Sequence, residues 1–295
     1  MMTTPIEIYE GIYVKRDDLC FQPPAPPFSK CRGVLEHLRK LKDQGVMTVG
    51  YTETAISMAG WAVAWACKKL RMEAVIFDPQ YKVTPETLSY HREQWKQFNP
   101  TIHPIPAGRA KVGWYQSKKI LLEEYDANGV MLPLGLPFQE SIVATCLEMK
   151  ETLKSTNLTF RTVVSCIGSG TMFAGLWNGI ELSTAERIGA LKSIGITYNP
   201  PKIDLYGVLT RTGSVEHKKE VIQKKAMLQT DGFWKSFTNI HLIDPGWEYT
   251  QRYDAYWPLE IPFPCNPFYD AKAWEWLIRN KADLKEPILF WNIGS

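Results

Sequence analysis

The segment that most constrains the fold joins an apolar run to a small-residue turn. Residues 163–167 read Val-Val-Ser-Cys-Ile, typical of a buried strand, and a helical pattern at 172–180 follows after only four residues. Those four are Gly168, Ser169, Gly170 and Thr171. A strand that enters a helix this way leaves backbone N–H groups unpaired at the positive end of the helix dipole. The segment therefore predicts a loop suited to a phosphate, although many such corners carry two glycines only to turn tightly.

Strands and helices alternate along the chain. Patterns typical of strands lie at residues 12–19, 46–51, 74–78, 102–105, 130–134, 163–167, 204–209 and 288–292. Patterns typical of helices lie at residues 30–41, 61–70, 139–153, 172–180, 215–228 and 271–280. This alternation predicts an α/β fold in which helices cover both faces of a parallel sheet. In such sheets, ligands bind beyond the carboxyl ends of the strands.

Composition restricts the classes of protein that the chain can belong to. Hydrophobic residues make up 45% of the 295 residues and the net charge is only +3, which is ordinary for a soluble protein and gives no argument for nucleic acid or a membrane surface. No secretory signal and no apolar stretch long enough for a bilayer is visible. The six cysteines are scattered, which favours free thiols in the cytoplasm over a zinc site or disulfides.

Lys30 is a candidate nucleophile. Ser29 is placed as the cap of the helix at residues 30–41, which puts Lys30 in its first turn. The helix dipole and partial burial would lower the pKa of its ammonium group, as a nucleophilic amine requires. The alternative is one more solvated lysine, and from local spacing alone that alternative is the stronger.

A second group of polar residues precedes the helix at residues 61–70. It contains Glu53, Thr54 and Ser57. Hydroxyl groups at a helix start usually cap it, and a glutamate there suits the dipole. The functional interpretation is a second anion or substrate site. A basic segment at residues 109–119, with interleaved aromatic residues, is open to a similar choice between phosphate contact and a solvated helix face.

Several segments, taken in order, resemble one known superfamily. Residues 14–19 (Val-Lys-Arg-Asp-Asp-Leu) and 29–32 (Ser-Lys-Cys-Arg) are similar to Lys-Arg-Glu-Asp-Leu and Asn-Lys-Thr-Arg segments of the 1-aminocyclopropane-1-carboxylate deaminase and D-cysteine desulfhydrase branch. Residues 266–273 (Asn-Pro-Phe-Tyr-Asp-Ala-Lys-Ala) are similar to its Asp-Pro-Val-Tyr-(Glu/Thr)-Gly-Lys segment, and residues 288–294 to its closing strand. The Gly168 loop resembles its cofactor-phosphate loop. This branch belongs to the fold-type-II pyridoxal-phosphate enzymes, the tryptophan synthase β superfamily.

The resemblance implies a fold, a cofactor and site residues. It implies two parallel-sheet open αβα sandwiches with the active site between them: a large cofactor-binding domain, 1–33 and 141–295, and a small substrate-side domain, 34–140. The cofactor is pyridoxal 5'-phosphate, with Lys30 as the Schiff-base lysine and the Gly168 loop on the phosphate. Asp270 would face the pyridine nitrogen, although its position also suits a helix cap. Tyr269 would donate or accept a second proton, or pack beside the ring.

The chain also departs from the superfamily. The loop asparagine that contacts the ring oxygen is matched by Met58, and the closing His-Thr-Gly-Gly reads Asn-Ile-Gly-Ser at residues 292–295. Residues 53–60 look more like the Glu-Thr-Gly-Ala-Gly-Gln-His-Gly loop of tryptophan synthase β, which makes Glu53 a candidate acid/base. Thr54 and Ser57 would hold a substrate carboxylate, which Glu53 would repel unless it is protonated.

Three function classes follow. The leading one is a lyase or deaminase that acts at Cα or Cβ of an amino acid or amine through Lys30. The second is a pyridoxal-phosphate enzyme for a bulky substrate, an amino-acid-modified nucleobase or nucleotide, by decarboxylation or elimination, with nucleic acid as a possible partner. The third is a degenerate, non-catalytic ligand-binding relative. A homodimer with a small-molecule substrate, no metal and no membrane partner is expected.

Overall fold

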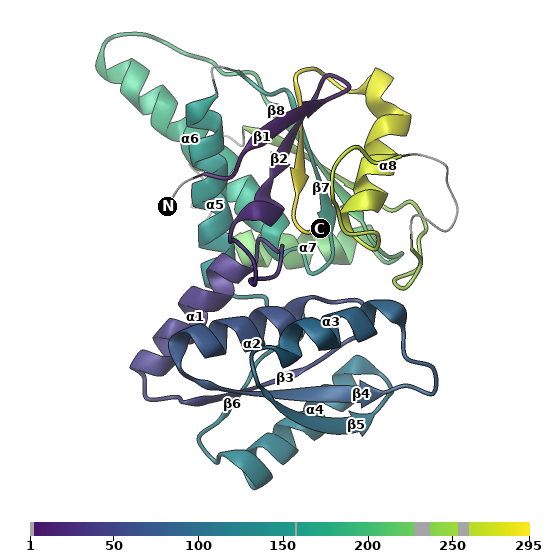
Figure 1. Ribbon diagram of the computed structural model, residues 1–295. Coiled ribbons are helices and arrows are strands. Elements are labelled where there is room, and N and C mark those ends of the chain that lie inside the picture. The colour runs from purple at the N-terminus through teal and green to yellow at the C-terminus, as the bar shows by residue number, and fades with distance from the viewer. Residues whose placement is uncertain (1–2, 157, 227–236, 253–259) are drawn as a thin grey trace. The chain divides into compact units, whose positions relative to one another are not determined.

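The computed structural model describes residues 3–156, 158–226, 237–252 and 260–295 (Figure 1). The chain divides into two compact units: unit 1 is Met1–Cys20 with Ser141–Ser295, and unit 2 is Phe21–Glu140. The first boundary lies thirteen residues before the position expected from the sequence, because helix α1 (Cys31–Asp43) packs on helix α2 (Ala59–Leu70) and so groups with unit 2.

Unit 1 contains a six-stranded sheet in the order β1-β2-β10-β7-β8-β9. The strands are β1 (Ile6–Tyr9), β2 (Ile12–Arg16), β7 (Thr162–Ile167), β8 (Ile203–Leu209), β9 (Thr238–Ile243) and β10 (Ile288–Asn292). The β1–β2 pair is antiparallel, whereas the other pairs are parallel. Strand β10 thus lies between β2 and β7, although it comes last in the sequence.

Four helices belong mainly to this sheet: α5 (Gln139–Ser155), α6 (Thr171–Ser193), α7 (Val215–Ala226) and α8 (Asp270–Asn280). Helix α8 lies on one side of the sheet, and α5 and α6 lie on the other (Figure 1). Helix α7 packs against α6 and β9. Short 3-10 turns, Asp17–Leu19 and Lys281–Asp283, follow β2 and α8. Every residue of β7 and β10 is buried, so these two strands form the centre of the unit.

Unit 2 contains a parallel sheet in the order β5-β4-β3-β6. Its strands are β3 (Thr48–Thr52), β4 (Glu73–Gln80), β5 (Thr101–Pro106) and β6 (Val130–Met131). Helices α2 and α3 (Glu86–Lys96) lie on one face, and α4 (Ala110–Ile120), which continues into the π-helical turn Leu121–Tyr125, lies on the other (Figure 1). Phe77, Leu121 and Met131 meet in its core.

The predicted α/β fold with parallel sheets is confirmed, and the differences are local. Strands β1 and β9 were not expected from the sequence. Strand β1 pairs with β2 through a tight turn in which Glu10 and Gly11 both have positive φ, 52° and 78°. Strand β6 ends at Met131 because Pro133 has no N–H to continue the ladder. The helix expected at 215–228 is described only as far as Ala226, and of the aromatic segment at 247–264, residues 253–259 lie outside the described residues.

Three further expectations from the sequence concern the cysteines, a membrane span and the basic segment. All six cysteines carry free thiols. In the described part of the chain, no helix combines the length and apolarity that crossing a membrane requires. Lys111, Lys118 and Lys119 of the basic segment are exposed, which agrees with a solvated helix face.

Candidate active site

The predicted strand–turn–helix corner is present in unit 1. Residues 168–170 connect β7 directly to α6, and Gly170 is the residue at the N-terminal cap of that helix, with φ 80°. A Cβ at Gly170 would lie 2.8 Å from Cγ1 of Ile222, so both the backbone conformation and the packing require glycine. The hydroxyl oxygens of Ser169 and Thr171 lie 2.9 Å apart. The first turn of α6 contains no acidic residue, which leaves its backbone N–H groups suited to an anion.

Two lysines of α7 reach this loop, and the sequence reasoning missed both. Lys218 Nζ donates to the Gly168 carbonyl at 2.8 Å, and Lys225 Nζ donates to the Ser169 carbonyl and, at 3.2 Å, to Thr171 Oγ1. Burial lowers the pKa of both ammonium groups, that of Lys225 to about 8 with a further contribution from the charge of Lys218. Their spacing of seven residues, two turns of a helix, was the available signal.

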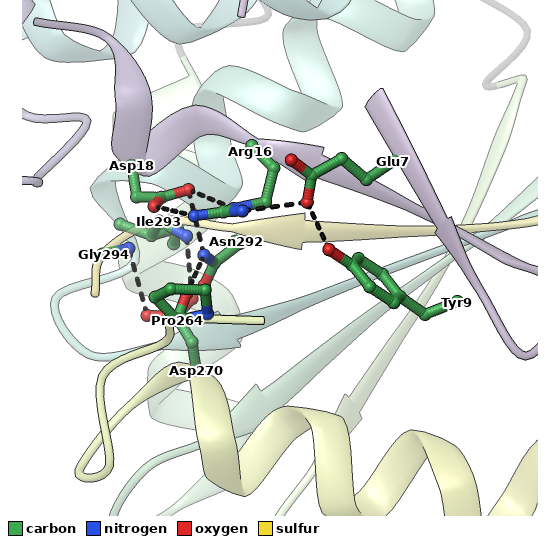
Figure 2. Close-up of polar contacts among 9 residues, drawn as sticks. All are labelled: Glu7, Tyr9, Arg16, Asp18, Pro264, Asp270, Asn292, Ile293 and Gly294. Atoms are coloured by element: carbon green, nitrogen blue, oxygen red, sulfur yellow. Dashed lines mark hydrogen bonds and ion pairs between the residues drawn. The ribbon is translucent and has the colours of Figure 1, made fainter. Parts of the chain in front are cut away.

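Asp270 is buried at the first position of α8. Its Oδ1 accepts the Ile293 N–H at 2.8 Å, and its Oδ2 accepts the Gly294 N–H at 3.2 Å (Figure 2). Cys166 Sγ also lies 3.5 Å from Oδ1. Tyr269 is the cap residue of α8, and among the described residues no side-chain hydrogen bond caps this helix. The interpretation of Asp270 as a helix cap is therefore wrong, because its carboxyl group bonds to the chain after β10 and not to its own helix.

The Asp270 carboxyl group has an unusual electrostatic environment. Burial raises its pKa to about 7, the negative charge of Asp18 acts in the same direction, and the hydrogen bonds from Ile293, Cys166 and Gly294 oppose the rise. Among the described residues, no lysine or arginine forms an ion pair with it. A cationic group brought next to this carboxyl would therefore stabilise its ionised form.

The Val14–Leu19 motif fixes the backbone that Asp270 binds. Arg16 donates from Nε and Nη2 to the two carboxylate oxygens of Asp18, at 3.0 and 2.8 Å. Asn292 Nδ2 donates to Asp18 Oδ1 at 3.0 Å and also to the Pro264 carbonyl (Figure 2). Asn292 directly precedes Ile293. The Arg16–Asp18 ion pair and the hydrogen bond from the Asn292 side chain to Asp18 therefore hold in place the N–H groups that face Asp270.

Tyr269 lies beside the glycine loop. A Cβ at Gly168 would lie 3.4 Å from Cε1 of the Tyr269 ring, and the Tyr269 hydroxyl is hydrogen-bonded to that of Tyr249 at 2.9 Å. In unit 1, Tyr269 therefore lies at the loop and Asp270 at Cys166 of β7, the strand that leads into the loop. The roles of these residues toward a cofactor stay predictions.

In unit 2, Lys30 is buried, with 8% of its surface exposed, so the alternative of a solvated lysine is wrong. Its Nζ donates to the Gly135 carbonyl at 2.7 Å and lies 5.7 Å from the centre of the Phe28 ring. The expectation that Ser29 caps α1 is also wrong. Lys30 itself is at the cap position, and the buried Ser29 hydroxyl has no hydrogen-bond partner among the described residues.

Glu53 follows β3 and is buried. Its Oε1 accepts the neighbouring Thr54 N–H at 2.8 Å, but burial dominates and raises the pKa of its carboxyl group to about 8. Glu53 is therefore largely protonated at neutral pH, the condition under which it does not repel a substrate carboxylate. Ser57 Oγ accepts the N–H of Ala59, the first residue of α2, at 3.1 Å, whereas the Thr54 hydroxyl has no partner in the described part of the chain.

Further charged residues surround Glu53, and the sequence did not single them out. Asp78 at the end of β4 forms an ion pair with Arg92 of α3, with Oδ1 and Nη2 2.8 Å apart, and both charges act on Glu53. Burial lowers the pKa of His91 to about 4, against the effect of a hydrogen bond with the Ser57 backbone. These groups lie at the carboxyl end of the parallel strands, where α/β sheets bind ligands. Met58 is buried beside them at the start of α2.

Comparison with known proteins identifies one relative that matches nearly the whole chain. No family model matches the chain. The chain is 35% identical over 305 residues to a glycyl-dTMP PLP-dependent decarboxylase of Pseudomonas phage M6, covering 99% of this chain and 98% of that protein.

Solved structures share the fold. An ACC deaminase homologue superposes with a TM-score of 0.76 at 20% identity, covering 100% of this chain and 90% of the other. A hydrogen sulfide-producing enzyme from Fusobacterium nucleatum has a TM-score of 0.65 at 12% identity, covering 99% and 95%. The Escherichia coli diaminopropionate ammonia lyase has a TM-score of 0.63 at 13% identity, covering 100% and 83%.

The described residues fit pyridoxal 5'-phosphate. The Gly168 loop offers the N-terminal end of α6 and two lysines to a phosphate, and Asp270 offers to a protonated ring nitrogen a buried carboxyl group that has no ion-pair partner among the described residues. With this fit and a relative that matches nearly its whole length, the chain belongs to the fold-type-II family of pyridoxal-phosphate-dependent enzymes that includes the phage glycyl-dTMP decarboxylase, and its cofactor is pyridoxal 5'-phosphate.

Proposed function

We propose that this protein is a pyridoxal-phosphate-dependent decarboxylase that acts on a glycyl-modified thymidine nucleotide. The similarity to the phage glycyl-dTMP decarboxylase carries the proposal, because it extends over 99% of this chain at 35% identity. The proposal favours the second function class given by the sequence over the lyase or deaminase class. The ACC deaminase homologue, at 20% identity, supports the fold and not the reaction.

The residues of unit 1 would hold the cofactor. The N–H groups of the Gly168 loop would bind its phosphate, and Asp270 would keep its ring nitrogen protonated. When bound, the cofactor supplies an electron sink for the electrons left on Cα when a bond to that carbon breaks. Ile293 and Gly294 keep the Asp270 carboxyl group in place through their N–H groups.

The residues of unit 2 would hold the cofactor aldehyde and act on the substrate. Lys30 would attach the cofactor and is buried away from competing water. Among the described residues the Thr54 hydroxyl has no partner, whereas Ser57 Oγ already accepts the Ala59 N–H, so Thr54 is the better candidate of the two for the substrate carboxylate. As a neutral acid, Glu53 tolerates that carboxylate and carries a proton.

With the cofactor as electron sink, the proposed reaction needs no further reactant except a proton. The bond between Cα and the carboxylate carbon breaks, carbon dioxide leaves, and its bonding electrons remain on Cα. A proton then adds to Cα, for which we propose Glu53 as the donor, and the product is the corresponding amine. Glu53 regains its proton from solvent.

We propose a homodimer, as the resemblance implies, and a cytoplasmic location, which the six free thiols support. Analytical ultracentrifugation tests the assembly.

The activity is tested with purified protein and pyridoxal 5'-phosphate. Incubation with glycyl-dTMP should release carbon dioxide and give a product 44 mass units lighter, the mass of the carbon dioxide lost. Lys30→Ala should show no turnover. 1-Aminocyclopropane-1-carboxylate and D-cysteine, assayed for ammonia and sulfide, represent the competing class. Ammonia or sulfide release without decarboxylation of glycyl-dTMP would overturn the proposal.

A further inference from the structure

Helix α7 is fixed against the glycine loop at three points. Lys218 and Lys225 donate to the carbonyls of Gly168 and Ser169, and between them Ile222 fills the space next to Gly170. Asn178 of α6 donates to the Ala226 carbonyl at 2.7 Å, which anchors the end of α7. The two ammonium groups are therefore held at the loop by packing and are not two surface lysines that happen to point toward it.

The loop carries more positive charge than the described residues balance. Neither Lys218 nor Lys225 has an ion-pair partner in the described ranges. The charge of Arg211 lowers the pKa of Lys218, and the charge of Lys218 lowers that of Lys225, in addition to the larger effect of burial. The acceptors that they do have are carbonyl and hydroxyl oxygens, which carry no net charge. Half-buried ammonium groups in this setting are stabilised by an anion.

We propose that Lys225, assisted by Lys218, binds the phosphate of the cofactor together with the N–H groups of the loop. The phosphate is then recognised by side-chain charge as well as by the backbone. This inference rests on the proposed placement of the phosphate at the Gly168 loop. In the present arrangement Lys225 contacts Thr171 Oγ1, a hydroxyl in the first turn of α6, so its ammonium already lies at the helix end that would face the phosphate.

A purely structural role for Lys225 predicts a different outcome. In that case its only function is the hydrogen bond to Ser169, and an uncharged donor such as glutamine replaces much of it. If the positive charge of Lys225 binds the phosphate, arginine at this position should preserve binding and glutamine should not. Lys224, exposed on the same helix, provides a matched control.

The experiment titrates the cofactor-free full-length chain with pyridoxal 5'-phosphate and with pyridoxal, which lacks the phosphate, and follows tryptophan fluorescence. Lys225→Gln should weaken pyridoxal 5'-phosphate binding by about ten- to hundred-fold, the range for one hydrogen bond to a charged group. Lys225→Arg should retain most of the affinity, and Lys224→Gln all of it. Pyridoxal affinity should be the same in every variant, and inorganic phosphate should compete less well in Lys225→Gln.

The outcomes separate this inference from the proposed function. Wild-type affinity in Lys225→Gln, or an equal loss of pyridoxal binding, would overturn the role of the Lys225 charge. Failure of Lys225→Arg to retain affinity would also count against it. Wild-type protein that binds pyridoxal and pyridoxal 5'-phosphate equally well would instead refute the phosphate loop itself. Protein that binds phosphate normally but does not decarboxylate glycyl-dTMP would refute only the proposed function.

Discussion

A Cβ atom at Gly60 would lie 2.0 Å from Oε2 of Glu53, so the missing side chain at position 60 makes room for the Glu53 carboxyl group. Gly60 is the second residue of α2, and Glu53 follows β3. The absence of a side chain at Gly60 therefore allows the carboxyl group of Glu53, the candidate acid, to lie against the first turn of α2. The similar segment of tryptophan synthase β also ends in glycine. In this chain the contact with Glu53 gives a steric reason for glycine at position 60.

We expect Gly60→Ala to destabilise the protein although alanine favours helices. Overlap with a buried carboxyl group should cost about 1–3 kcal/mol of the free energy of unfolding, measured by urea titration. Gly189→Ala, at an exposed helical glycine with open space around it, should raise stability by up to about 1 kcal/mol. Combining Gly60→Ala with Glu53→Ala should recover much of the loss, and simple additivity would contradict the steric explanation.

Glu53→Gln tests proton donation by the neutral carboxyl group. Glutamine has nearly the same shape and is also neutral, so KM for glycyl-dTMP should change by less than about ten-fold, whereas kcat should fall by about 10²–10⁴. Because the pKa of Glu53 is raised to about 8, wild-type kcat should decline as the pH rises above that value. Unchanged kcat in Glu53→Gln would assign the proton to another group.

The stability of the cofactor-free protein should depend on pH through Asp270. Its pKa is about 7 in the folded state against an ordinary value of 3.8, so between these values the folded chain holds a proton that the unfolded chain has lost. Stability from this group is therefore complete below about pH 4 and decreases as the pH rises to about 7. Asp270→Asn should flatten the decline, measured by urea unfolding at each pH. Asp283→Asn, at an exposed position, should leave it unchanged, and an equally steep decline in Asp270→Asn would contradict the assignment.

Borohydride reduction in the presence of pyridoxal 5'-phosphate should place the pyridoxyl label on Lys30. Two other lysines compete with Lys30 for the label, because burial lowers the pKa of Lys225 and that of Lys272 to about 8 in each case. Lys272 Nζ is held by the carbonyls of Thr210 and Glu248, both at 2.9 Å. Peptide mapping by mass spectrometry identifies the labelled lysine. A label on Lys225 or Lys272 would remove Lys30 from the proposed site.

Features set by neighbouring residues could be predicted from the sequence. The Gly168 loop is such a case, because the apolar strand, the glycines and the helical pattern lie within about twenty residues of one another. Strand β10 is also predictable, since it is a continuous apolar run. Glu53 is also a candidate from the sequence, and its position beside Thr54 and Ser57 predicts that it tolerates a substrate carboxylate only when it is protonated.

Features set by residues distant in the sequence could not be predicted. Asp270 binds Ile293 and Gly294, and Lys225 binds Ser169, contacts that depend on how the strands are ordered in the sheet. The prediction that Ser29 caps α1 is wrong for a different reason. Local preference favours it as a cap, but the Cys31 N–H already donates to the Phe28 carbonyl at 3.0 Å, so a backbone turn satisfies the start of α1.

The place of β10 in the sheet has a consequence for biosynthesis. Asn292 bonds to Asp18 across 274 positions of sequence, and β10 separates two strands made much earlier. On the ribosome, β2 and β7 cannot be joined until residues 288–292 have emerged. Contacts this remote slow folding, and they also hold the N–H groups that orient Asp270. A nascent chain with a complete glycine loop therefore still lacks an ordered Asp270, so full capture of the cofactor is expected only after translation has passed β10.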